Sequence, residues 1–200
     1  MTCLGYSDRI QHALAFAAKH APSRRPAGRV VPHSPDLAGT GVALILASEG
    51  ADEPTLIAAI LRPAVANPRN QLDRVPDKFG REVGSLLGTL HPLPLGWAVG
   101  MGGPDARDLA LELARGDDAR ASLVVLGEAV QSCGAWVTAA RRLGSEYASV
   151  LPLDRAEAVG WLVGLAQSLE RGPAAHCTAL VRDLRRLGAE LVRSLPSREA

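Results

Sequence analysis

Residues 41–68 read GVALILASEGADEPTLIAAILRPAVANP, and this stretch predicts two apolar helices joined by a short turn. Val42 and Leu46 lie at helical spacing before the turn, and Leu56 and Ile60 repeat that spacing after it. Each segment therefore presents an apolar stripe, and two such stripes in succession predict a helical hairpin with a shared core.

The turn carries residues suited to ending one helix and beginning the next. Gly50 tolerates the positive φ common at helix C-termini, and Asp52 can cap the following helix. Pro63 is different, because a proline beyond the first turn removes a backbone hydrogen bond and crowds the carbonyl four residues earlier. We expect the second helix to kink or end near Leu61 or Arg62.

The rest of the chain predicts more helices and no sheet, since apolar residues keep helical spacing and strand signals are very short. We expect one all-α domain over residues 1–200, with about eight to ten helices. Segments 42–61, 79–90 and 123–137 should form its centre. The side chains that we expect to be buried are Phe16, Ile45, Leu46, Leu56, Ile57, Ile60, Phe79, Val83, Leu86, Leu123, Leu126, Val130 and Leu162.

Composition favours a globular protein and gives no sign of nucleic-acid or membrane binding. A content of 47% hydrophobic and 22% charged residues is typical of a globular domain, and a net charge of +1 gives no global reason to bind nucleic acid or a membrane surface. Cys3, Cys133 and Cys177 are isolated thiols, so we expect a reduced, cytoplasmic protein with buried cysteines. Asp8 and Arg9 interrupt the N-terminal stretch where a signal peptide needs apolar residues.

The chain resembles the HD phosphohydrolase superfamily, and within it the hydrolase domain of RelA/SpoT alarmone enzymes and their small single-domain relatives. The resemblance rests on residues 13–21 (ALAFAAKHA), 51–61 (ADEPTLIAAIL) and 79–83 (FGREV), in the family's order. It implies an HD-type helical fold.

The family's functional residues are missing at the matching positions. Where the family has HDxxED, this chain has RPAVAN, with Arg62 and Pro63 in place of the metal-binding pair and Ala66 and Asn67 in place of the acidic pair. Its later LADRLHN motif corresponds to residues 126–132, where a carboxylate remains at Glu128. The resemblance therefore implies no metal, no cofactor and no catalytic residue.

The first histidine ligand of the family has two candidate positions. A match with a gap before the helix places His33 there, and an ungapped match places Ala38 there. An isolated carboxylate among apolar residues is costly, so Glu128 needs a partner, solvent or a proton. Arg62 is one candidate partner, its guanidinium replacing the metal charge; the alternative is two unrelated residues in a collapsed site.

Residues 22–36 form a proline-rich basic loop. In the resembled enzymes this loop holds the nucleotide, and Arg25 best matches the arginine that contacts guanine, with Arg24 and Arg29 as neighbours. The alternative is an ordinary solvated basic loop. If the chain binds a guanine nucleotide or a phosphate, we expect the ligand next to Arg24 and Arg25, whose guanidinium groups can stack and form forked hydrogen bonds.

Residues 91–104 combine prolines and glycines without a preceding strand or a GKS or GKT triplet, so a phosphate loop is not indicated. We expect a mobile connection, with Trp97 pinning it to the body.

Two functions follow from these features. The leading one is a catalytically inactive pseudo-hydrolase that binds a nucleotide or a protein partner, including a second copy of itself. The alternative is a divergent phosphohydrolase acting on guanosine polyphosphates or another nucleotide, with a site built from His33, Asp36, Asn67 and Glu128.

Overall fold

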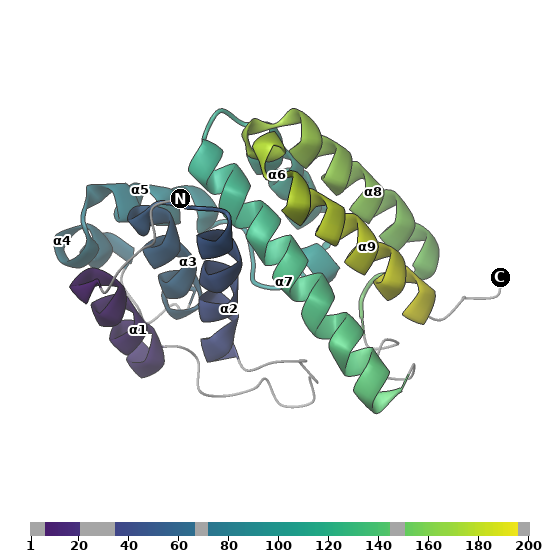
Figure 1. Ribbon diagram of the computed structural model, residues 1–200, viewed down its shortest axis with the longest axis horizontal. Helices are drawn as coiled ribbons and strands as arrows, with labels where there is room; N and C mark the ends of the chain where they lie inside the picture. Colours follow the sequence, from purple (N-terminus) through teal and green to yellow (C-terminus); the bar gives the residue numbers. More distant parts are fainter. Residues whose placement is uncertain (1–6, 21–34, 67–71, 145–150, 196–200) are drawn as a thin grey trace. The chain divides into compact units, whose positions relative to one another are not determined.

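The computed structural model describes residues 7–20, 35–66, 72–144 and 151–195, which contain nine α-helices and no strand (Figure 1). The predicted all-α fold is confirmed. The chain divides into two compact units, Met1–Pro92 and Leu93–Ala200, which are described in turn. The prediction of a single domain stays a prediction, since it depends on whether the two units fold together.

The first unit is built around α3 (Glu53–Val65), in which every residue from Thr55 to Val65 is buried. The other elements of the unit are α1 (Asp8–His20), α2 (Pro35–Ser48), the 3₁₀ helix η1 (Leu72–Arg74), α4 (Val75–Phe79) and α5 (Arg81–Leu90). Helices α1, α2 and α5 all pack against α3. The predicted hairpin is the α2–α3 pair.

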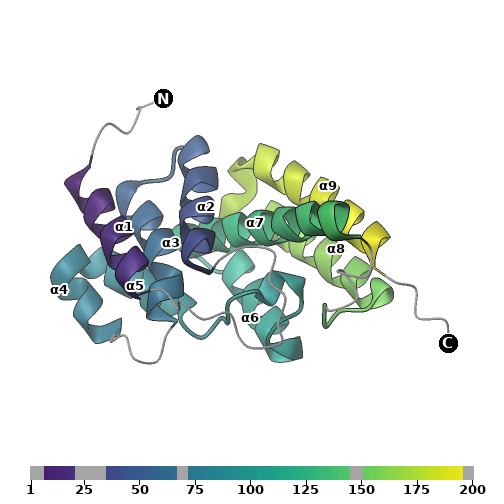
Figure 2. The ribbon, with the colours of Figure 1, turned by 90° about the horizontal axis from the view of Figure 1, so that it is seen from below.

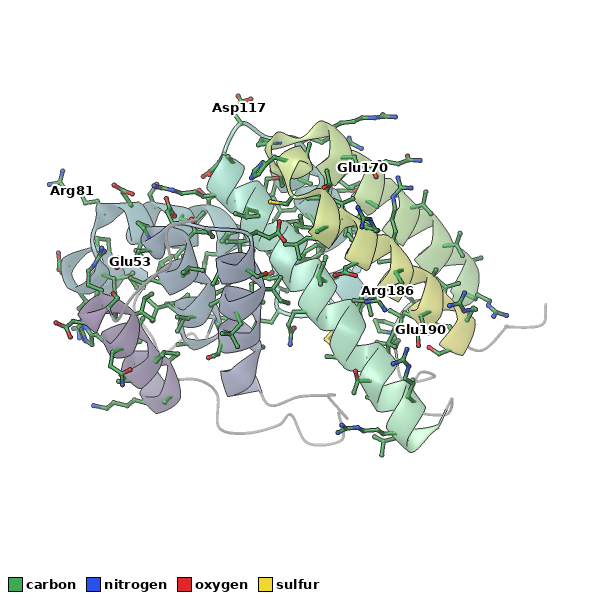
Figure 3. All side chains as sticks on the ribbon, in the orientation of Figure 1. Glu53, Arg81, Asp117, Glu170, Arg186 and Glu190 are labelled. Carbon is green, nitrogen blue, oxygen red and sulfur yellow. The ribbon has the colours of Figure 1, made fainter. Side chains whose placement is uncertain are left out.

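The turn of this hairpin forms as predicted. Gly50 has a φ of 77°, and the side chain of Asp52 accepts a hydrogen bond of 3.0 Å from the amide of Thr55. Glu53, labelled in Figure 3, accepts hydrogen bonds from Ser7 and Arg9 on the neighbouring N-terminal segment.

Of the two outcomes predicted at Pro63, a helix end is wrong, because α3 continues to Val65, and a kink stays a prediction. Pro63 lacks the amide that would bond to the carbonyl of Ala59. Gly39 of α2 packs against this point: a Cβ on Gly39 would lie 2.6 Å from the Ala59 oxygen and 2.8 Å from the Ile60 oxygen. The close approach of α2 shields the carbonyl that the proline leaves without its helical partner.

Segment 79–90, expected at the centre of the fold, is not one continuous helix: Phe79 ends α4, and α5 begins at Arg81. Gly80 has a φ of 94°, which is outside the helical region, and it separates α4 from α5. Phe79 and Val83 on either side are both buried. The apolar spacing is therefore preserved across a bend that the hydrophobic pattern does not reveal.

The second unit is built around the long helix α7 (Ala119–Leu143). Its other elements are the 3₁₀ helices η2 (Trp97–Val99) and η4 (Pro173–His176), and the helices α6 (Gly103–Arg115), α8 (Arg155–Arg171) and α9 (Thr178–Ser194). Helices α6 and α9 pack on α7. By length and composition α7 could cross a membrane, but 72% of its apolar window is buried inside the fold.

Two caps in this unit follow the sequence rules. Asp118 accepts hydrogen bonds from the amides of Arg120 and Ala121 at the start of α7. Asp154 and Glu157 form a capping box at the start of α8, the pattern of an acidic N-cap followed three residues later by glutamate.

The expected mobile connection over residues 91–104 is wrong in its middle part, where Leu93, Trp97, Ala98 and Val99 are buried. Left-handed glycines allow the chain to fold back on itself there; Gly96 has a φ of 78° and Gly100 of 93°. The prediction that Trp97 holds this segment to the body is confirmed, since its indole bonds to α7.

The predicted core is confirmed except at Phe16 and Ile45, which are half-buried. Phe16 lies at the edge of the first unit, with its ring 5.5 Å from that of Phe79 and the ammonium of Lys78 5.2 Å from its centroid. Helical spacing identifies the inward side of α1 and α2, but it does not show where that side meets solvent.

Candidate functional site

Arg62 stands on α3 with only 2% of its surface exposed. Its Nη1 donates a hydrogen bond of 2.8 Å to the backbone oxygen of Leu90, the last residue of α5. The carbonyls at a helix C-terminus lack helical partners and carry the negative end of the helix dipole. Arg62 therefore acts as a buried cap of α5.

Pro63 follows directly and is also buried, with no donor atom in its side chain. A divalent metal ion held by protein side chains here would need imidazole or carboxylate ligands, and a fixed guanidinium repels such an ion. The pair of side chains at this point of α3 does not fit a metal ion. Within the described ranges, no group of three or more His, Cys, Asp and Glu side chains is placed to hold one.

Glu128 lies on α7 in the second unit and is partly buried. Its Oε2 accepts a hydrogen bond of 2.7 Å from Nε1 of Trp97, which is 1% exposed. Trp161 of α8 meets Trp97 edge to face, with ring centroids 5.9 Å apart, and its own Nε1 donates to the oxygen of Ala98 at 3.0 Å. Glu128 thus belongs to a cluster that fastens η2 to α7 and α8.

The sequence predicted that the carboxylate of Glu128 needs a partner, and Trp97 provides one. The sequence analysis did not identify Trp97 as that partner. Trp97 is one of three tryptophans in the chain and lies among glycines, which is a signal of a packed anchor. No sequence pattern reveals that Arg62 caps α5, because Arg62 and its partner Leu90 lie far apart in the chain.

The other candidate residues are not described. Arg24, Arg25, Arg29, His33 and Asn67 fall outside the described ranges, as does the side chain of Asp36. Arg62 and Glu128 belong to different units. Their pairing, and the nucleotide pocket that includes them, stay predictions.

The two described cysteines, Cys133 and Cys177, are free and buried, as expected. Burial raises the pKa of the Cys133 thiol to about 12. The thiol therefore stays protonated at neutral pH and is a poor nucleophile.

The described residues form an all-α fold that is similar to the fold of HD hydrolase domains. No family model and no curated protein matches the sequence. Among solved structures, the chain is similar to a metazoan ortholog of SpoT, which hydrolyses ppGpp and plays a role in starvation responses. The TM-score is 0.64 with 20% identity, over 92% of this chain and 97% of that one. At this identity the likeness concerns the fold.

An Arg62→Met variant should lose about 1.5–3 kcal/mol of stability. Methionine fills a similar apolar volume but leaves the buried Leu90 oxygen without this charged donor. Urea denaturation followed by far-UV circular dichroism measures the loss. Arg81→Met, at an exposed site on α5, is the control and should change stability by less than about 0.5 kcal/mol. Equal stability of the two variants would contradict the capping role.

Proposed function

We propose that this chain is a catalytically inactive HD-fold protein, a pseudo-hydrolase, that binds a guanine nucleotide or a protein partner in the cytoplasm. The observation that supports this proposal is Arg62. A buried guanidinium that caps α5 stands where the resembled enzymes have a metal-binding histidine.

The chemistry of hydrolysis depends on that histidine and its neighbour. HD enzymes use a metal ion to polarise the phosphate and to lower the pKa of a bound water. Arg62 contributes a positive charge instead of a ligand, and Pro63 contributes no donor atom. Glu128, the remaining carboxylate, is held by the indole of Trp97. We therefore expect the fold to bind a nucleotide or a protein partner without hydrolysing a nucleotide.

The basic loop is the proposed ligand contact. Arg24 and Arg25 offer planar guanidinium groups, which stack on bases and form forked hydrogen bonds with phosphates. Guanine nucleotides are the preferred ligand class because of the resemblance of Arg25 to the guanine-contacting arginine.

The test combines turnover and binding on the full chain. Incubation with ppGpp and manganese should release no pyrophosphate, and calorimetry with ppGpp should show binding that Arg25→Ala weakens. Arg182→Ala, which removes an exposed arginine on α9 of the second unit, is the matched control and should leave affinity unchanged. Binding that both variants leave unchanged would remove the basic loop from the proposal.

Other outcomes lead to other functions. Absence of any nucleotide binding would favour the protein partner as the ligand. Release of pyrophosphate together with one manganese per chain would show a divergent phosphohydrolase, and His33 and Glu128 would then be the first residues to substitute.

A further inference from the structure

We draw no further inference here: the strongest candidate, the apolar groove lined by Val163, Ala166, Ala189 and Val192 between α8 and α9, which lie side by side in both views (Figure 1, Figure 2), carries none, because nothing in the structure shows what covers it.

Discussion

A Gly39→Val variant is expected to lose about 3 kcal/mol or more of stability, because side chains inserted into a tight helix contact force the backbone apart. The new Cβ would lie 2.6 Å from the oxygen of Ala59 and 2.8 Å from that of Ile60. These are backbone atoms in the buried part of helix α3, so they cannot move aside as a side-chain end would. The loss is measured by urea denaturation, or by soluble yield if the variant does not fold.

The matched control is Gly88→Val, which places the same side chain in helix α5. A Cβ on Gly88 meets no described heavy atom within 4 Å, and glycine is a poorer helix former than valine. This variant should therefore be as stable as the parent or slightly more stable. A Gly39→Val protein with the same denaturation midpoint as Gly88→Val would show that α2 and α3 do not approach this closely.

Truncation of a core residue in each unit should cost roughly 2–5 kcal/mol. Leu126 on α7 and Ile57 on α3 have no exposed surface, so alanine leaves a cavity at either site. Leu143→Ala, on the same helix as Leu126 but 64% exposed, is the control and should change stability by less than about 0.5 kcal/mol.

The same pair of variants tests the single-domain prediction. Trp97, Trp136 and Trp161 are the three tryptophans of the chain, and all belong to the second unit. Tryptophan fluorescence therefore follows that unit, while circular dichroism follows helices of both. If the chain unfolds as one domain, Ile57→Ala lowers the midpoint of the fluorescence transition too. If the units unfold separately, that midpoint stays at the parent value.

The sequence left two interpretations of Arg62 and Glu128 open: a pair whose charges compensate each other, or two unrelated residues. Their pairing stays a prediction, and the described contacts of each residue lie within its own unit. Arg62 donates to the end of α5, and Glu128 accepts from Trp97, so both contribute to packing within their own units. Residues at positions that match the resembled family's motif thus contribute to the packing of their own unit.

The sequence by itself determined the helical fold and most of the core. Apolar spacing of 3.6 residues marks the inward side of a helix, and local signals such as Gly50, Asp52 and the Asp154–Glu157 box mark its ends, because these depend on neighbours within one turn. It also located the metal-motif positions at Arg62 and Pro63, through the resemblance.

Only the tertiary structure decided how those positions are used. The helix passes through Pro63 because Gly39, from another helix, packs against the carbonyl that the proline leaves behind. Arg62 donates to Leu90, and Glu128 accepts from Trp97, at separations of 28 and 31 residues along the chain. Such partners are set by the packing of whole helices, which local propensity and periodicity do not encode.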